Sequence, residues 1–310
     1  MNPPAIEIRG LTKQFSRFAL GPLDLTVPAG AIYGLIGPNG SGKSTTMDLL
    51  FGMGRKDGGS MRAAGFDHVR EEMAMKRVVT YSSPDTSFAV WGKVGSVIRF
   101  VKDFYPAWDQ ELCLRLLDVF RLRPGDKISQ LSFGARTKLS LLLALCPRPR
   151  VLVLDEPTTG LDPEARQILM RELLRLVEDE TRTVLISSHQ LSDVERFADH
   201  VGILSKGRLI CEGPTADLVA RHRMVEYSLA EGGAFPPMAG DLAGFHPRRR
   251  EGDRCLAVVD LEANPVETLE ARGLRIHSKT ELSLEEIFLA LTSGSAAASG
   301  SVTAPGKEAA

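Results

Sequence analysis

The stretch that decides the fold of this chain is Gly37-Pro38-Asn39-Gly40-Ser41-Gly42-Lys43-Ser44-Thr45. It matches the pattern G-x-x-x-x-G-K-[ST] and follows an apolar run, residues 31–36, with the composition of a buried strand. The three glycines allow a tight turn whose backbone N–H groups point at one anion. A helix beginning at Lys43 would add the positive end of its dipole. The pattern predicts a phosphate-binding loop; a glycine-rich turn that binds nothing is the alternative interpretation.

The side chains of this loop have separate predicted tasks. Lys43 places a positive charge on the β- and γ-phosphates of a nucleotide and is a candidate catalytic residue. The Ser44 hydroxyl, one residue later, can ligate a Mg²⁺ ion that bridges the same phosphates. The predicted nucleotide-binding residues of the loop are Gly37, Asn39, Gly40, Ser41, Gly42, Lys43, Ser44 and Thr45.

The composition indicates a globular protein of about two domains. A formal net charge of −1 argues against a nucleic-acid partner held by bulk electrostatics. No apolar run approaches the roughly 18 residues that span a bilayer, and no secretory signal begins the chain, so we expect a cytosolic protein. Four scattered cysteines lack metal-ligand spacing and are expected to be reduced and mostly buried. They are Cys113, Cys146, Cys211 and Cys255.

Two carboxylates follow the most apolar predicted strand, residues 150–154. In sheets whose strands are buried on both faces, ligands gather at the carboxyl ends of the strands. Asp155 is therefore predicted to hold Mg²⁺ through water. Glu156 is predicted to orient or deprotonate the water that attacks the γ-phosphate. A helix cap or a surface turn is the alternative interpretation of this acidic pair.

His189 follows another apolar strand, residues 183–187. A lone histidine is usually a surface or core residue, but one at the carboxyl end of a parallel strand can reach the γ-phosphate. Between the two strands, Asp162 and Pro163 predict the start of a helix that runs to residue 177, with Asp162 as its N-cap.

The rest of the first 220 residues alternates strands and helices. Phe15 lies between the first two predicted strands and could stack on adenine, with a core position as the alternative. Residues 84–147 are predicted to be a helical insertion between strands of a parallel sheet. We expect strands at 6–9, 20–27, 77–81, 201–204 and 208–211, and helices at 43–53, 109–120 and 134–146.

Taken together, residues 5–216 resemble the ATPase subunit of an ATP-binding cassette (ABC) transporter. The resemblance rests on the phosphate loop, the acidic pair, Gly160-Leu161-Asp162 and His189. It also rests on residues 131–135, Leu-Ser-Phe-Gly-Ala, which are similar to the family's Leu-Ser-Gly-Gly-Gln signature. This implies an α/β fold with a P-loop NTPase core built on a mostly parallel sheet, an antiparallel β subdomain and a helical subdomain.

The resemblance also implies ligands and partners. ATP and Mg²⁺ are the expected cofactors, and two subunits, identical or homologous, would pair head to tail around two ATP molecules. Ser132 and Gly134 would then contact the γ-phosphate bound by the partner, and Asp162 is included among the nucleotide-binding residues. Phe15 falls where the family has an adenine-stacking aromatic residue. An integral membrane permease would be the second partner, with this subunit on the inner face of the plasma membrane.

Two departures from the family pattern stand out. Phe133 and Ala135 replace a glycine and the glutamine of the signature, which points to the bacterial exporter branch of ABC-2 type. The family's Mg²⁺-sensing glutamine has no clear match after residue 81, and either Ser83 or Asp85 could reach the metal through water instead. Of the two, Asp85 is the predicted metal ligand. This change bears on the hydrolysis rate or its coupling to the membrane partner.

Six aromatic residues follow that segment. In the family this region accepts a cytoplasmic helix of the membrane subunit, and exposed aromatics are typical interface anchors. Filling the core of the helical subdomain is an equally good interpretation of each residue. The six are Phe88, Trp91, Phe100, Phe104, Tyr105 and Trp108.

Beyond residue 220 the resemblance fades. Residues 221–292 are predicted to form a small accessory α/β domain, with strands at 224–229, 255–259 and 274–277 and helices at 264–271 and 284–291. Arginines 248–250 are expected in a solvated loop, with a contact to anionic lipid as the alternative. Residues 293–310, rich in Ala, Ser and Gly, are expected to be disordered.

The sequence therefore predicts an ATPase subunit whose dimer closes on ATP and drives a separately encoded permease, most readily for export. A soluble ABC-type ATPase acting on ribosomes, DNA or an assembly scaffold is the main rival. A regulatory module that binds ATP and hardly hydrolyses it is a third possibility, because of the missing glutamine. The sequence names neither the transported molecule nor the role of the C-terminal domain.

Overall fold

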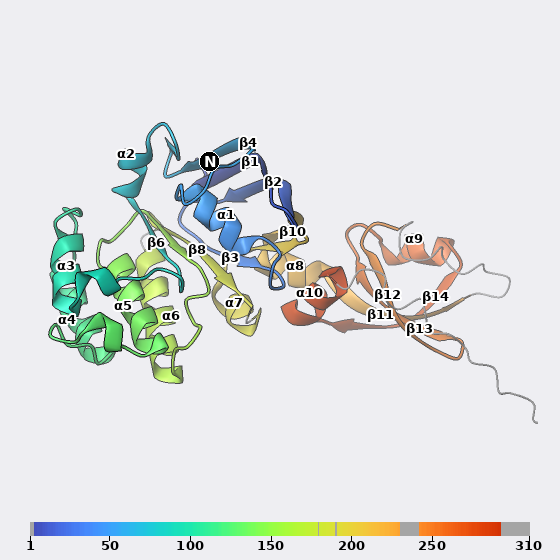
Figure 1. Ribbon diagram of the computed structural model, residues 1–310. Coiled ribbons are helices and arrows are strands. Elements are labelled where there is room, and N and C mark those ends of the chain that lie inside the picture. The colour runs from blue at the N-terminus through green and yellow to red at the C-terminus, as the bar shows by residue number, and fades with distance from the viewer. Residues whose placement is uncertain (1–2, 179, 190, 230–241, 293–310) are drawn as a thin grey trace, which may run out of the picture. The chain divides into compact units, whose positions relative to one another are not determined.

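The computed structural model describes residues 3–178, 180–189, 191–229 and 242–292. The described chain forms two compact units that divide between Thr215 and Ala216, N-terminal to the predicted boundary at residue 220 (Figure 1). The predicted disordered tail, 293–310, lies outside the described residues. Within the described part of the chain, no helix is both long and apolar enough to cross a bilayer.

A six-stranded sheet in the order β10-β9-β3-β8-β7-β6 forms the centre of the first unit. All its neighbouring strands pair in parallel except β9 and β10, which form an antiparallel hairpin. Every residue of β3, β7 and β8 is buried, which is why these strands have continuous Val, Leu and Ile runs. The strands are β3 (Ile32–Ile36), β6 (Val79–Ser82), β7 (Val151–Leu154), β8 (Thr183–Ser188), β9 (His200–Ser205) and β10 (Arg208–Pro214).

The register of this sheet brings three chain segments to one edge. Ile36 of β3 lies opposite Ser188 of β8, and Leu154 of β7 lies opposite Ile186 of β8. The loops that follow these three neighbouring strands therefore leave the sheet together. The predicted α/β fold with a parallel sheet is confirmed.

An antiparallel sheet in the order β2-β1-β4-β5 forms a second layer of the first unit. Its first two strands were predicted, whereas β4 was not, because its sequence Gly-Gly-Ser-Met-Arg-Ala lacks an apolar alternation. The strands are β1 (Ile6–Gln14), β2 (Ala19–Val27), β4 (Gly58–Ala63) and β5 (Phe66–Asp67), and helix α2 (Glu72–Lys76) follows them.

The segment between β6 and β7 is helical, as predicted. It contains η1 (Ala89–Trp91), α3 (Val94–Lys102), α4 (Gln110–Val119), η2 (Ile128–Gln130) and α5 (Phe133–Leu145). The other helices of this unit are α1 (Lys43–Leu50), α6 (Pro163–Val177) and α7 (Leu191–Phe197), and α8 (Thr215–Arg221) begins at the division between the units. The prediction that α1 runs to residue 53 is wrong, because Gly52 takes a left-handed conformation with φ 73° and ends the helix.

The second unit contains a four-stranded antiparallel sheet in the order β12-β13-β11-β14. The prediction of a loop at arginines 248–250 is wrong, because they lie on β12, where Arg249 and Arg250 pair with Leu256 and Cys255. The run Phe-His-Pro-Arg-Arg-Arg-Glu has no strand signal by itself and pairs with the apolar β13. The elements are β11 (His222–Leu229), β12 (Phe245–Glu251), β13 (Arg254–Asp260), α9 (Val266–Ala271), β14 (Leu274–Glu281) and α10 (Leu284–Thr292).

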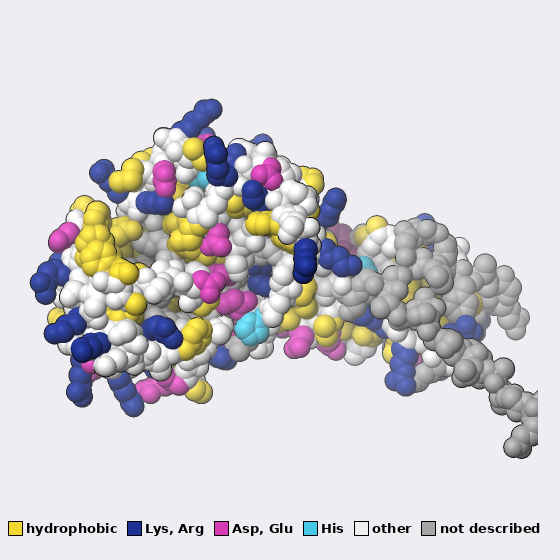
Figure 2. All heavy atoms as spheres, viewed as in Figure 1, with side chains coloured by type: hydrophobic (Ala, Val, Ile, Leu, Met, Phe, Trp, Pro, Cys, Tyr) yellow, Lys and Arg dark blue, Asp and Glu magenta, His cyan; other side chains and the backbone are white. Residues whose placement is uncertain are grey.

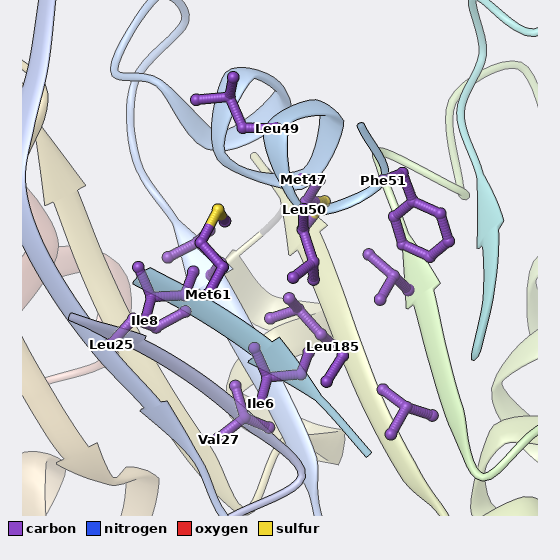
Figure 3. Packing of buried hydrophobic residues seen from close by; sticks show 14 of the residues in the cluster. Ile6, Ile8, Leu25, Val27, Met47, Leu49, Leu50, Phe51, Met61 and Leu185 are labelled. Carbon is purple, nitrogen blue, oxygen red and sulfur yellow. The ribbon is translucent and has the colours of Figure 1, made fainter. Parts of the chain in front are cut away.

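One hydrophobic core of the first unit contains side chains from both sheets and from α1 (Figure 3). Side chains of the antiparallel sheet, such as Ile6, Leu25 and Met61, meet Leu50 of α1 and Leu185 of the parallel sheet. The phosphate-loop helix is therefore held from both sides by apolar contacts. Outside this cluster, Cys113, Cys146 and Cys255 are buried free thiols, as expected, and Cys211 is half-buried.

Replacing Leu50 by alanine should destabilise the first unit, because only 1% of this side chain is exposed and truncation leaves a cavity in the core. We expect a loss of about 2–5 kcal/mol in the free energy of unfolding, measured by urea denaturation. Leu114→Ala, at a side chain of α4 that is 59% exposed, is the matched control. Equal losses for the two variants would contradict the packing described for α1.

Candidate nucleotide-binding and catalytic site

The phosphate loop occupies residues 37–42, between β3 and α1, in a conformation that requires glycine at several positions. A Cβ atom at Gly37 would lie 2.2 Å from Leu204 O, so no other residue fits there. Gly40 and Gly42 have φ values of 77° and 111°, in the left-handed region that favours glycine. Ser41 Oγ is buried and has no hydrogen-bond partner among the described residues, as expected for a hydroxyl that serves a ligand.

Lys43 is held over this loop by its own backbone. Its Nζ donates to Gly37 O at 2.7 Å and to Pro38 O at 3.4 Å. Burial lowers the pKa of Lys43, while the carboxylates of Glu156 and Asp155 raise it. The ammonium group is thus partly desolvated beside two acids, and a bound phosphate would strengthen the charged form.

One hydroxyl of β8 positions both acids that follow β7. Ser187 Oγ donates to Asp155 Oδ1 at 2.6 Å and accepts from the backbone N–H of Glu156 at 2.8 Å. Asp155 N–H also donates to Ser82 O of β6 at 2.8 Å. Ser187 was not among the predicted site residues. Its position near the end of an apolar parallel strand, two residues before His189, is the sequence feature that could have indicated its role.

Glu156 is at the centre of the site. Its φ of 45° is left-handed, which is uncommon for a residue with a side chain and costs about 1–3 kcal/mol. Glu156 Oε2 lies 2.5 Å from His189 Nδ1, and Glu156 Oε1 lies 3.8 Å from Lys43 Nζ. The structure therefore brings together three residues that the sequence predicted separately. In Figure 2, acidic side chains and a histidine gather in the middle of the visible face of this unit.

The signature segment packs on the turn before α6. Ser132 caps α5 through its Oγ, which accepts from Ala135 N–H at 3.2 Å. A Cβ atom at Gly134 would lie 2.4 Å from Gly160 O, and one at Gly160 would lie 2.5 Å from Phe133 Cδ1. The Phe133 ring, the residue that departs from the family signature, thus closes over a glycine of the Gly160-Leu161-Asp162 segment.

Asp162 links the same two segments through charge. Lys138 Nζ of α5 donates to Asp162 Oδ2 at 2.5 Å, and this pairing lowers the pKa of Asp162. Asp162 Oδ1 also accepts from Ala165 N–H at 2.8 Å, which confirms the predicted N-cap of α6. Its predicted contact with nucleotide stays a prediction.

Phe15 lies in the turn between β1 and β2 and is exposed. Its ring centroid is 6.1 Å from that of Phe18, and Lys13 Nζ is 5.7 Å from the Phe15 centroid. Phe18 in turn reaches Gly42, because a Cβ atom there would lie 3.1 Å from Phe18 Cζ. The turn is therefore close to the phosphate loop, and an exposed ring beside it is available to stack on a base.

Ser83 and Asp85, the two candidates for the missing glutamine, differ in exposure. Ser83 is buried, and its Oγ accepts from Asp85 N–H at 3.3 Å. Asp85, in contrast, is exposed. An acid that the sequence reasoning passed over, Asp48 of α1, accepts a hydrogen bond from the Tyr81 hydroxyl at 2.8 Å in the same neighbourhood.

Comparisons with known proteins agree with this geometry. Residues 20–159 match the family described as ABC transporter. The daunorubicin/doxorubicin resistance ATP-binding protein DrrA of Streptomyces peucetius is 33% identical, over 93% of this chain and 92% of that protein. The Nod factor export ATP-binding protein I of Rhizobium sp. (strain N33) is 31% identical, over 94% of this chain and 98% of that protein.

Solved structures share the fold. A structure described as the ATP-binding subunit of an ABC transporter has a TM-score of 0.64 and 25% identity, and the match covers 70% of this chain and 92% of that one. A bacterial Atm1-family ABC exporter with ATP bound has a TM-score of 0.60 and 24% identity, and the match covers 71% of this chain and 40% of that one. The sequence match to DrrA spans nearly the whole of both chains, and with the shared fold it shows that this chain belongs to the ABC transporter family, among its ATP-hydrolysing subunits.

Proposed function

We propose that the chain hydrolyses ATP with Glu156 as the general base, His189 as the group that orients it, and Lys43 as the charge on the β- and γ-phosphates. The contact of 2.5 Å between Glu156 Oε2 and His189 Nδ1 carries this proposal. It leaves the other oxygen of Glu156 on the side of Lys43 Nζ, 3.8 Å away. A water molecule between that carboxylate and the γ-phosphate would be deprotonated as it attacks.

The chain's own residues also fit a Mg²⁺ ion. Ser44 offers an exposed hydroxyl, and Asp155 offers a carboxylate whose Oδ1 is oriented by Ser187. Oxygen donors of this kind are the ligands that Mg²⁺ prefers, and Ser44 and Asp155 would hold it. When bound there, the ion would neutralise charge that develops on the phosphate oxygens.

Glu156→Gln should keep ATP binding and slow hydrolysis by about 100-fold or more, because the amide cannot accept the proton of the attacking water. Steady-state phosphate release and filter-binding of radiolabelled ATP measure the two effects. Glu111→Gln, at an exposed position in the first turn of α4, is the control and should match the parent. Turnover at the parent rate by Glu156→Gln would remove Glu156 from the role of base.

We further propose that two subunits pair head to tail. Support comes from the signature helix α5, whose N-terminal Ser132 and Phe133 are exposed while its later residues are buried in the helical part. The N-terminus of a 13-residue helix favours an anion, and the γ-phosphate bound by the partner subunit would be that anion. The segment holding Gly160 and Asp162, packed on Phe133, would lie at the same interface.

A mixing experiment tests the pairing. Lys43→Ala removes the phosphate contact of a subunit's own loop, and Ser132→Arg blocks its signature, so each variant alone should be inactive. In a head-to-tail heterodimer, one site keeps both an intact loop and an intact signature. Mixing the inactive variants should restore up to about one quarter of the parent ATPase rate.

Circular dichroism of Ser132→Arg checks that loss of the cap leaves α5 folded. No recovery of activity on mixing folded variants that exchange subunits would show that each site is complete within one chain, contrary to the head-to-tail arrangement.

The proposed place of the subunit is on the inner face of the plasma membrane, bound to a permease and working in export. The name of the relative Nod factor export ATP-binding protein I supports export and argues against a soluble ATPase acting on ribosomes or DNA. An apolar surface also supports a protein partner. Trp91, Phe100 and Phe104 form a contiguous aromatic cluster, with centroids 3.8 Å apart between Trp91 and Phe100 and 4.9 Å apart between Phe100 and Phe104.

This aromatic cluster is accessible to solvent. Phe104 is 58% exposed, Phe100 is exposed, and a yellow patch covers this part of the helical region in Figure 2. None of the six aromatic residues that follow residue 85 is buried. The interface interpretation is therefore favoured over a purely internal role, at least for Phe100 and Phe104.

Phe104→Ser should weaken the retention of a multi-span membrane partner when the tagged protein is purified from solubilised membranes, because the anchor residue is lost. ATP binding by the variant should equal that of the parent. Leu114→Ser, an equally exposed apolar position on α4, should leave retention unchanged. Parent-level recovery of the membrane partner with Phe104→Ser would place the interface elsewhere.

A further inference from the structure

The hydrogen bond between Tyr81 and Asp48 has no role in the site described above. Tyr81 is the penultimate residue of β6, and its hydroxyl donates to Asp48 Oδ1 of α1 at 2.8 Å. The Tyr81 ring stacks on Phe51, with centroids 4.8 Å apart, so the hydroxyl is held in place by packing. The bond ties the phosphate-loop helix to the strand that leads into residues 83–85.

Sheet register places this bond beside the acids of the site. Tyr81 lies opposite Val153 in the parallel pair β6 and β7. Asp155 comes two residues after Val153, and since side chains alternate along a strand, Asp155 lies on the same face as Tyr81. Val153 belongs to the core cluster that includes residues of α1, and the partly buried Tyr81 packs against this cluster. This face is therefore the one that α1 covers.

Asp48 also follows the loop residues in helical order. It comes four residues after Ser44, and residues at this spacing lie above one another on one face of a helix. Ser44 is the proposed metal ligand of the loop, so the Asp48 carboxylate lies one turn further along the same face. Asp48 thus lies on the face of α1 that carries the proposed metal ligand Ser44.

Electrostatics agrees with this placement. Burial raises the pKa of Asp48, and the carboxylates of Asp155 and Asp85 raise it further, against the hydrogen bond from Tyr81. Three acids that repel one another form a polar site that a cation would stabilise. Of the three, Asp48 is oriented by the hydroxyl of the half-buried Tyr81, and Asp85 is exposed.

We propose that Asp48, held by Tyr81, accepts hydrogen bonds from water molecules of the Mg²⁺ that binds with ATP, and so acts where the expected glutamine is missing. This inference rests on the proposed ATP and Mg²⁺ site. Asp48 is then a positioning residue, because it acts on the metal through water. Tyr81 carries the link from the bound nucleotide into residues 83–85, at the start of the helical region.

The test is the Mg²⁺ dependence of ATP binding, measured by fluorescence of a labelled ATP analogue in the Glu156→Gln background, where hydrolysis is slow. Asp48→Asn should raise the Mg²⁺ concentration for half-maximal binding by about 10-fold, the lower end for loss of an outer-shell group. Binding without Mg²⁺ should not change. Tyr81→Phe keeps the carboxylate but frees its orientation, so it should shift the midpoint in the same direction by less.

Glu111→Gln, which removes an exposed acid of α4, is the control and should leave the midpoint unchanged, whereas Asp85→Asn tests the rival candidate for the metal contact. A normal midpoint in Asp48→Asn, or a shift confined to Asp85→Asn, would overturn the proposal while the parent still binds ATP with Mg²⁺. Failure of the parent to bind ATP at all would instead overturn the proposed function. Thermal denaturation establishes that each variant is folded, and Tyr81→Phe provides a second, milder test.

Discussion

The pairing of β8 with both β3 and β7 is the constraint on which the site depends. Because both pairs are parallel and in register, the phosphate loop, the acidic pair and His189 all leave the sheet at one edge. The Ser187 hydroxyl of β8 then fixes both residues of the acidic pair, because it donates to Asp155 and accepts from the backbone N–H of Glu156. A slip of one residue in β8 would turn Ser187 to the other face and leave both acids unsupported.

Strain and burial at this edge are balanced by specific contacts. Glu156 has a left-handed backbone, Lys43 is buried, and the loop glycines take conformations that other residues rarely adopt. Packing of α1 between two sheets supplies the rigidity that holds these groups in place. The side chains of the site are thus held by contacts within this subunit.

The helical region connects to this edge through two separate contacts. On one side, Phe133 and Lys138 of α5 meet Gly160 and Asp162, next to the acidic pair. On the other, the bond from Tyr81 to Asp48 ties β6, the strand that precedes the helical segment, to α1. Each contact joins a segment of the nucleotide site, either the turn before α6 or helix α1, to α5 or to the strand that precedes the helical region. A movement of the helices would therefore change both of these contacts.

The sequence by itself determined the parts whose signal is local. The phosphate loop, the apolar strands, the acidic pair and the cap at Asp162 follow from residue type and spacing, and they predicted the fold class and most of the site. The tertiary structure decided what depends on pairing between distant segments. Strands β4 and β12 form because neighbouring strands supply their partners, although their own sequences carry Gly, Pro and Arg. Sheet register brings the Ser187 hydroxyl to Asp155, and helix packing brings the Tyr81 hydroxyl to Asp48, and no local pattern encodes either contact.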